Sequence, residues 1–298
     1  MKRLLVAATV MLAAGVAQAQ EAKKVTIAIY APNAPFASGQ DRFNYVNRLA
    51  QQIASVAGVQ AEGKAFARAG DLEAAIKAKQ VDFAVVDGVY LAERGVPFTV
   101  MAIATTGGET QPKWALFSSV GTDVKSLQGK RLSAAHSGSR DDEFIGNALF
   151  DGELQVKKFF AQKNEAPDLA AAVAAVTLKK ADAVFAPESE GKGLKNVFEA
   201  GRIPNPAFCD VGSGLDGGVI AKIKQAVLAH GVQAALDGWK ASDAGPYRAL
   251  ASRMGGRVKR PVMTEPTVVK LEDLDVLVPP TLEPTQPDLR PQYWVPTP

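Results

Sequence analysis

The chain has 298 residues, of which 47% are hydrophobic and 22% charged, with a formal net charge of +3 at pH 7. This length accommodates two domains with ordinary cores, and the composition is typical of a soluble globular protein. Loss of the two basic residues in the leader described below would bring the charge close to neutral, which argues against nucleic acid as a partner.

Cysteine and histidine are too scarce for a disulfide framework or a zinc centre. The single cysteine, Cys209, cannot form an internal disulfide even where export would permit one, and we expect it to be buried. His136 and His230 cannot by themselves supply the ligands of a zinc site. We therefore predict no metal and no cofactor.

The N-terminus is typical of a secretory signal peptide. Lys2 and Arg3 precede an apolar run over residues 4–16, and Ala17-Gln18-Ala19 matches an A-x-A cleavage site. The run is too short to span a bilayer, and no later run is long enough. Because no cysteine follows the cleavage site, lipid attachment is not supported. We expect a periplasmic protein that is soluble once residues 1–19 are removed.

Strands and helices alternate after the leader. Residues 24–30 form a predicted strand that ends in a Pro-rich loop. A helix is predicted from Asp41 to the residue before Gly58, with an inward stripe of Phe43, Val46, Leu49, Ile53 and Val56. A strand over 60–66, a helix, a third strand and a fourth over 98–105 follow. The β-α-β-α-β order predicts a parallel sheet with right-handed crossovers.

Two stretches of the chain share one plan. Residues 71–88 and 168–188 each begin with Asp-Leu, continue through an Ala-rich helical pattern and end in a short, apolar strand. Asp71 and Asp168 are the predicted N-caps. The repetition predicts two α/β lobes of similar construction. Because ligands of open α/β sheets bind beyond the carboxyl ends of the strands, we expect a ligand between the lobes.

The second lobe is predicted to begin after the Gly-containing loop at 106–108. Its strands are expected over 113–118, 131–135, 155–160 and 183–186. The chain returns through 195–209, where Ile203-Pro204-Asn205-Pro206 permits an extended strand but no helix. A helix over 219–229 and a helical region over 232–250, interrupted at Pro246, are expected to follow.

These features divide the chain into four parts. We assign a signal peptide to 1–19, a discontinuous first lobe to 20–105 and 207–260, and a second lobe to 106–206. Residues 261–298 are rich in proline and are predicted to form an extended tail.

Three segments in a fixed order carry a family resemblance: AAIKAKQVDFAVVDGVYLAE, LQGKRLSAAHSGSRDDEF and FEAGRIPNP. Together with the exported strand–loop–helix start, they resemble the type II periplasmic solute-binding proteins, and among these the phosphate/phosphite/phosphonate-binding branch that serves ABC importers. The resemblance covers residues 24–258. It implies a two-lobed α/β fold in which each lobe is a mostly parallel sheet flanked by helices. The chain is expected to cross between the lobes twice, near Thr105 and near Ile203. Thr105 is also a candidate ligand contact. The resemblance also implies a monomer whose partners are importer membrane subunits.

The loop Ser137-Gly138-Ser139 opens a predicted helix, and its free N–H groups and the helix dipole favour an anion. In the resembled branch, Ser or Thr side chains of this loop hold an oxyanion, which makes Ser137 and Ser139 candidate ligand contacts. Alternatively, Ser139 and Asp142 form a capping box that needs no ligand. Arg140 is a candidate for holding a carboxylate, or a surface partner of Asp141. The acidic residues 141–143 depart from the family's small, uncharged pattern.

Further candidate contacts lie at strand ends. Asp87 could accept from an amine or hydroxyl, or simply cap the next helix. Tyr90 is expected to line the ligand cleft between the two lobes. Tyr30 ends the first strand and either stacks on a ligand or packs in the core, with Asn33 just beyond it. Glu188 closes the second repeated stretch and faces either the cleft or solvent.

No catalytic motif is found in the sequence. G-x-S-x-G and H-E-x-x-H are absent, and His136 beside Ser137 is adjacency rather than a dyad. We therefore predict a solute-binding protein, not an enzyme, that closes on a small polar ligand, with oxyanions among the candidates, and delivers it to an ABC importer. The alternative is a ligand-sensing or scaffold protein of the same fold that docks a partner through its Pro-rich tail.

Overall fold

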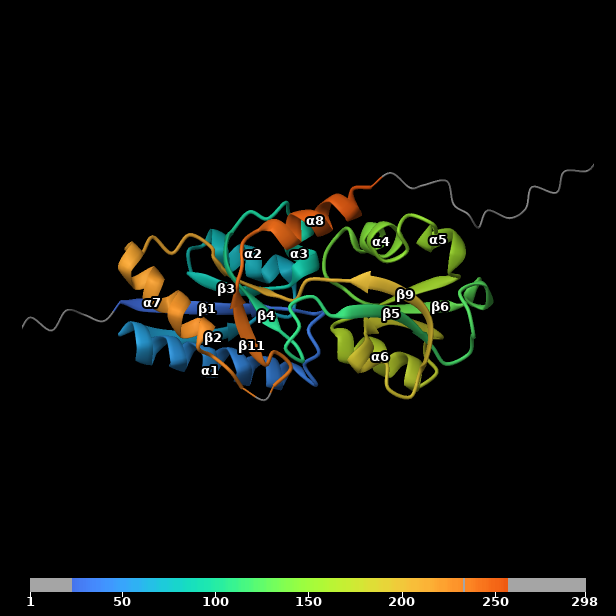
Figure 1. The fold of residues 1–298 in the computed structure, drawn as a ribbon, viewed down its shortest axis with the longest axis horizontal. Coiled ribbons are helices and arrows are strands. Elements are labelled where there is room, and N and C mark those ends of the chain that lie inside the picture. Colours follow the sequence, from blue (N-terminus) through green and yellow to red (C-terminus); the bar gives the residue numbers. More distant parts are fainter. Residues whose placement is uncertain (1–22, 233, 257–298) are drawn as a thin grey trace, which may run out of the picture. The chain divides into compact units, whose positions relative to one another are not determined.

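The computed structural model describes residues 23–232 and 234–256, which form two lobes, each a β-sheet flanked by helices (Figure 1). This confirms the two-lobed α/β fold. The predicted signal peptide and Pro-rich tail lie outside the described residues. Within those residues, no helix combines the length and apolar character needed to cross a membrane.

The first lobe contains a six-stranded sheet in the order β11-β4-β10-β3-β1-β2. The strands are β1 (Lys24–Tyr30), β2 (Gln60–Ala65), β3 (Phe83–Val86), β4 (Thr99–Thr105), β10 (Ala207–Asp210) and β11 (Gly238–Ala241). Pairing is parallel across β2-β1-β3 and antiparallel across β3-β10-β4-β11. The sheet is therefore mixed rather than mostly parallel. The chain leaves the lobe at the end of β4 and returns at the start of β10, so these neighbours must run in opposite directions.

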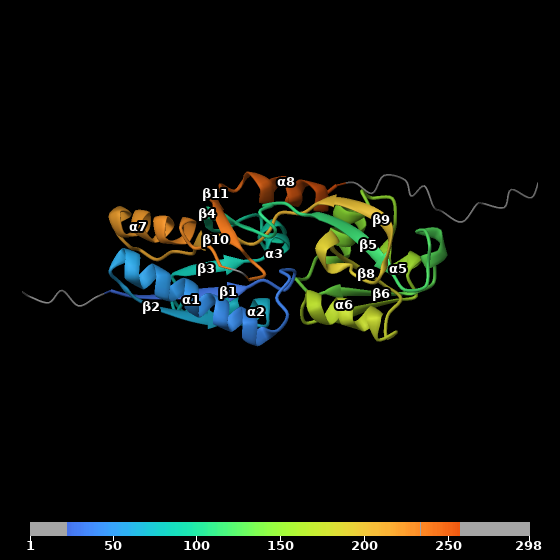
Figure 2. The same cartoon turned by 60° about the horizontal axis from the view of Figure 1, so that its bottom comes forward.

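Helices cover both faces of this sheet (Figures 1 and 2). One face carries α1 (Gly39–Ala57) and α7 (Gly217–Leu228), and the other carries α2 (Ala69–Lys77), α3 (Gly88–Glu93) and α8 (Gly245–Met254). Side chains of β1 alternate between the two cores: Ile27 and Ile29 pack with α1, whereas Ala28 and Tyr30 pack with α2 and α3.

The second lobe repeats the plan with a five-stranded sheet in the order β7-β6-β8-β5-β9. The strands are β5 (Lys113–Ser118), β6 (Arg131–Ala135), β7 (Gln162–Ala166), β8 (Ala183–Pro187) and β9 (Lys195–Arg202). Pairing is parallel across β7-β6-β8 and antiparallel across β8-β5-β9. Helix α6 (Leu169–Thr177) packs on one face. The short α4 (Asp141–Glu143), a π-helical segment η2 (Phe144–Leu149) and α5 (Val156–Phe159) complete the lobe.

The two repeated stretches have matching roles, with one difference at their caps. Asp168 caps α6 as predicted, because its carboxylate accepts from the Ala171 N–H at 3.0 Å. Asp71 does not cap α2. That helix begins two residues earlier, at Ala69, so Asp71 lies in the first turn and pairs with Arg68 at 2.9 Å.

The inward stripe predicted for the first helix was wrong at both ends. Ser38 caps α1 by accepting from the Asp41 N–H at 3.1 Å, so the helix begins at Gly39. Phe43 and Val56 are 43% and 39% exposed, because the buried stripe runs along the side of the helix that carries Tyr45, Leu49 and Ile53.

Two predicted elements took a different form. The strand predicted over 155–160 is the short helix α5, and the strand follows it as β7. The helical region predicted over 232–250 contains strand β11, which pairs with β4, and Trp239 Nε1 also donates to Tyr45 Oη at 2.9 Å. Pro246 lies in the first turn of α8 rather than interrupting a helix, because the N–H groups of a first helical turn have no partner within the helix.

Two crossings join the sheets, through residues 106–112 and 203–206. Asn205 ties them together: its N–H donates to Thr110 O at 2.9 Å, and its Nδ2 donates to Glu109 O at 2.9 Å and Ala104 O at 3.2 Å. The Tyr247 hydroxyl of α8 in turn donates to Asn205 O at 2.9 Å. The crossings are therefore coupled to each other and to α8.

Candidate functional site

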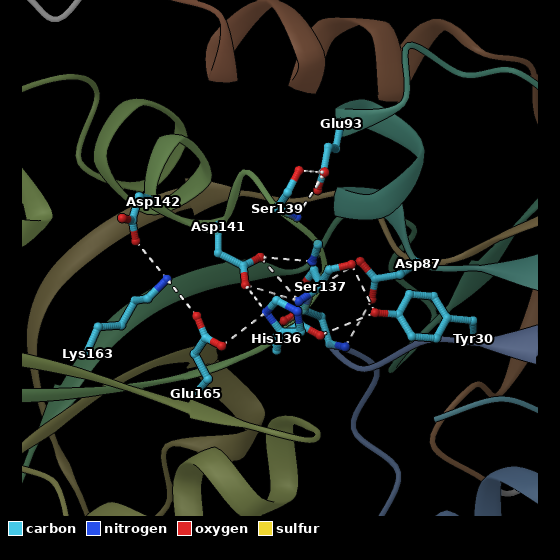
Figure 3. A network of polar contacts seen from close by, with 12 residues as sticks. Tyr30, Asp87, Glu93, His136, Ser137, Ser139, Asp141, Asp142, Lys163 and Glu165 are labelled. Atoms are coloured by element: carbon cyan, nitrogen blue, oxygen red, sulfur yellow. Dashed lines mark hydrogen bonds and ion pairs between the residues drawn. The ribbon is translucent and has the colours of Figure 1, made fainter. Parts of the chain in front are cut away.

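Polar residues of both lobes meet where the strands end (Figure 3). Tyr30, at the end of β1, donates from its hydroxyl to Ser137 O at 2.9 Å. Asn33, just beyond, donates from Nδ2 to Ser137 Oγ at 2.5 Å and to Asp87 Oδ1 at 3.2 Å. Because β1, β3 and β6 all point their carboxyl ends here, the structure brings four predicted site residues together.

Asp87 organises the first-lobe side of this contact. It is 1% exposed and accepts from the Asn33 N–H at 3.0 Å and the Val89 N–H at 2.9 Å. Asp87 therefore caps α3, as one of its two interpretations proposed, and at the same time holds Asn33 in place. Burial raises the pKa of this carboxyl, and no ion pair of Asp87 is found among the described residues.

Asp141 plays the corresponding part in the second lobe. Its carboxylate accepts from the backbone N–H groups of Ser137 and Gly138 at 3.2 and 3.3 Å, and contacts His136 Nδ1 at 2.8 Å. Burial raises the pKa of Asp141, which is 4% exposed. The loop that opens α4 is thus folded around a carboxylate of its own chain.

Glu93 and Ser139 form a second contact between the lobes. Glu93, the last residue of α3, accepts from the Ser139 N–H at 2.9 Å and from the Ser139 hydroxyl at 2.7 Å. The capping box proposed for Ser139 and Asp142 is absent from α4, since Asp142 instead pairs with Lys163 at 2.7 Å. The N–H groups expected to receive an oxyanion therefore face carboxylates of the protein in this structure.

His136, Asp141 and Glu165 form a cluster that sequence reasoning missed. One nitrogen and two carboxylate oxygens lie within 4.8 Å of one another. A histidine with two carboxylates is a donor set that divalent metals accept. Lys163 lies 3.4 Å from Glu165 and supplies positive charge to this cluster in the structure (Figure 3).

Two small hollows adjoin the polar contact and lie between residues of both lobes. Asn33 and Trp114 line both hollows, and each has a volume of about 10 Å³, which is room for roughly one water molecule. Asp87, Pro187 and the crossing residues 203–206 line the first hollow. Asp141, Phe144 and Phe185 are among those lining the second.

The other predicted site residues lie off these hollows. Tyr90 is 2% exposed, packs edge-on against Tyr30 at 5.5 Å, and donates from its hydroxyl to Glu73 at 3.2 Å. Thr105 donates from its hydroxyl to Asp237. Arg140 forms a surface ion pair, as one of its two interpretations proposed, but its partner is Glu143 at 3.9 Å rather than Asp141. Glu188 is exposed in a 3₁₀ turn after β8.

Besides Asp141 and Glu165, sequence reasoning did not identify the apolar residues that line the hollows, or Glu93. Trp114 is the second residue of β5, directly after the first crossing. Its position next to the crossing could have identified it as a candidate site residue. Phe144 begins the π-helical segment, a geometry that sequence patterns do not reveal. Glu93 had no local signal because its partner, Ser139, comes 46 residues later in the other lobe.

Further contacts join the lobes outside the hollows. Arg42 of α1 pairs with Asp168 at 3.2 Å, and the Leu169 N–H donates to Pro32 O at 2.8 Å. At the other end, α8 reaches the second lobe through Arg253, which donates to Arg202 O at 3.0 Å and also to Ala148 O.

Two sheets joined by two crossings, with polar side chains of both meeting at the strand ends, define the fold class of the type II periplasmic binding proteins. Solved structures agree. The binding component of a Pseudomonas aeruginosa ABC phosphonate transporter matches with a TM-score of 0.60 at 13% identity, over 78% of this chain and 86% of that one. Prochlorococcus marinus PhnD1, solved with methylphosphonate, matches with a TM-score of 0.60 at 12% identity, over 78% and 97%.

A Xanthomonas citri protein solved with ATP also matches, with a TM-score of 0.57 at 10% identity, over 78% of this chain and 98% of that one. At these identities the likeness establishes the fold. The chain therefore resembles the phosphonate-binding branch in its architecture. No protein-family model and no curated protein sequence matches the chain.

Proposed function

We propose that this chain is an exported solute-binding protein that closes its two lobes on a small ligand and delivers the ligand to an ABC importer. The observation that carries the proposal is the contact of Tyr30 and Asn33 in one lobe with Ser137 in the other. Side chains with these partners can hold the lobes together around a bound solute, and the fold is that of transport binding proteins.

Ligand uptake requires the lobes to separate. The two hollows together hold only a few atoms, so a solute cannot reach Asn33 or Trp114 while the lobes are in contact. Two crossings allow such a rotation through a few backbone dihedral angles. The signal-peptide pattern at residues 1–19 supports export, which would place the mature chain beside an importer.

A thermal-shift screen of the mature protein tests ligand binding. The panel should contain oxyanions, amino acids, amines and cofactor precursors. A solute at a hundred times its dissociation constant should raise the free energy of unfolding by about 2.7 kcal/mol. Deletion of the gene should then abolish cellular uptake of that solute. A bound solute whose uptake is unchanged would contradict the transport role.

Lobe closure is measured as a distance between spin labels on Gln51 of α1 and Ala174 of α6, each replaced by cysteine. Both residues are exposed, whereas the native Cys209 is 0% exposed and should not react. A saturating ligand should narrow the distance distribution and shorten its mean. A distribution that does not respond to a ligand known to bind would exclude hinge closure.

A further inference from the structure

The charged side chains that line the two hollows are both carboxylates. Asp87 lines the first hollow and Asp141 the second. Among the described residues, no lysine, arginine or histidine lines either one. An anion placed here would meet two buried acids and no basic partner, whereas a cation would meet opposite charge.

The hydrogen-bond donors that an oxyanion would need already have acceptors. Asp141 accepts from the Ser137 and Gly138 N–H groups, and Glu93 accepts from the Ser139 N–H and hydroxyl. An incoming phosphonate would have to displace two carboxylates of the protein from these donors. The donors of the loop at 137–139, which resembles an anion site, are therefore already occupied by the protein's own carboxylates.

The apolar part of the lining is aromatic. Trp114 lines both hollows, with Phe144 edge-on to it at 6.2 Å and 81°, and Phe185 lines the second hollow. The face of an indole ring attracts cations within about 6 Å of its centre, most strongly where water is excluded. Trp114 lines two hollows that each contain one buried carboxylate, Asp87 or Asp141, and this is a suitable setting for an ammonium group.

The lobe contact also concentrates negative charge. Asp87 and Glu93 come from the first lobe and Asp141 from the second, and all three lie close enough to Tyr30 to raise the pKa of its hydroxyl together with burial, which is the larger cause. Burial likewise raises the pKa of both aspartates. Bringing these acids together opposes closure, and a bound cation would offset that cost.

From this geometry we infer that the interlobe site takes a small organic cation, a primary or methylated ammonium, rather than an oxyanion. The ammonium would lie against Trp114 between Asp87 and Asp141, next to Asn33. The inference rests on the proposed function and names its ligand class. The rest of the ligand occupies space that opens as the lobes separate.

Calorimetric titration of the full mature chain tests the inference. The probes are methylammonium, choline, putrescine and arginine as cations, methylphosphonate and phosphate as anions, and glycerol as a neutral solute. EDTA is present throughout to exclude metal binding at His136, Asp141 and Glu165. We expect at least one cation to bind and both anions to give no heat of binding.

Two substitutions locate the site. Asp87→Asn keeps an N-cap side chain for α3 but removes the charge, and should weaken binding of the cation at least roughly tenfold. Trp114→Leu should weaken it by a similar factor, through loss of the ring face. Asp216→Asn is the matched control, because Asp216 is an exposed N-cap of α7 in the same lobe, and it should leave binding unchanged. Circular dichroism and thermal melting confirm that each variant is folded.

The outcomes separate the two proposals. Binding of methylphosphonate or phosphate without any cation would overturn the inference and leave the proposed function intact. Equal binding of the cation by Asp87→Asn, Trp114→Leu and Asp216→Asn would place the cation elsewhere and also overturn it. If no solute in this panel or in the wider thermal-shift screen binds, the inference and the proposed function both fail.

Discussion

The carboxylate of Glu93 accepts both hydrogen bonds that Ser139 can donate, at 2.9 and 2.7 Å, and so fastens the end of α3 to the opposite lobe. The other oxygen of Glu93 is buried and has no hydrogen-bond partner in the part of the chain that the structure describes. Gly138 makes this approach possible, because a Cβ there would overlap the Glu93 carboxylate. The contact holds the lobes together by means of the protein's own groups.

Removal of this contact should favour the open form. Glu93→Ala loses two exposed hydrogen bonds, which should change the free energy of lobe closure by about 1 kcal/mol. The distance between labels at Gln51 and Ala174 should lengthen in the absence of ligand. Glu153→Ala, which removes an exposed glutamate from the second lobe, is the matched control. An identical distance distribution in both variants would show that Glu93 does not govern closure.

The start of α3 lies against the second crossing, which makes Gly88 sensitive to substitution. A Cβ at this position would overlap Pro204 O, a backbone atom that cannot move independently. Gly88→Ala should therefore lower the free energy of unfolding by about 2 kcal/mol, as is typical of overpacking. Urea unfolding measures the change. Gly39→Ala, at the first position of α1 with open space around it, should show no such loss.

The ion pair between Arg42 and Asp168 should matter more than an exposed pair. Arg42 is 5% exposed, and the Asp168 side chain is 17% exposed. Asp168→Asn retains the cap of α6 but leaves the guanidinium buried without a carboxylate, which typically costs about 3 kcal/mol. Asp71→Asn, the corresponding change in the exposed Arg68–Asp71 pair, should change stability little.

A second substitution distinguishes a lost ion pair from a lost cap. Arg42→Met in the Asp168→Asn background removes the unpaired charge and should recover much of the stability. If urea unfolding instead shows additive losses, the effect of Asp168 does not depend on Arg42.

Asp182 gives the fold a defined dependence on pH. Arg131 donates to its carboxylate from Nε at 3.0 Å and Nη2 at 2.8 Å, which holds the pKa of Asp182 below its usual range. A carboxyl whose pKa is lower in the folded than in the unfolded state stabilises the fold above about pH 4. This stabilisation is lost as the pH falls through the folded pKa.

Asp182→Asn should therefore unfold at a lower urea concentration than the unsubstituted protein at pH 7. The difference between the two urea midpoints should become smaller at pH 3. Asp82 is the matched position, since its carboxylate accepts from the Thr26 N–H at 2.8 Å as Asp182 accepts from the Arg131 N–H at 2.9 Å. No ion pair of Asp82 is found in residues 23–232 and 234–256, so Asp82→Asn is the control that replaces a backbone-bonded carboxylate without breaking an ion pair. A constant difference for Asp182→Asn would contradict the assignment.

The repeated pattern in the sequence predicted the architecture well. Residues 71–88 and 168–188 occupy matching places in the two lobes, and the strands that follow each helix are buried as expected. The fold class and the resemblance to the phosphonate-binding branch were confirmed. Antiparallel strands were missed because local patterns carry no information about the direction in which the chain returns from the other lobe.

The sequence predicted those site residues that can be recognised from their position at the end of a strand. Tyr30, Asn33, Asp87 and Ser137 were identified because strand ends can be read from the sequence, and they meet in the structure. Their role in ligand binding stays a prediction. Which hydrogen bonds each would form depends on contacts more than 50 residues apart along the chain, as between Asn33 and Asp87. Tyr90 and Glu188 also follow buried strands, but Tyr90 lies within α3 and donates to Glu73, and Glu188 is exposed.

The strand order of the first sheet also constrains the sequence in which the molecule assembles. Within the described residues, strand β4 pairs with β10 and β11 and no other strand, and both of these follow the whole second lobe in the chain. The second sheet, by contrast, is complete at Arg202. As the chain emerges from the ribosome or a translocation channel, the second lobe can finish folding while both edges of β4 remain unpaired. Unpaired strand edges promote aggregation, so a chain arrested between residues 105 and 207 would expose β4 to association with other chains.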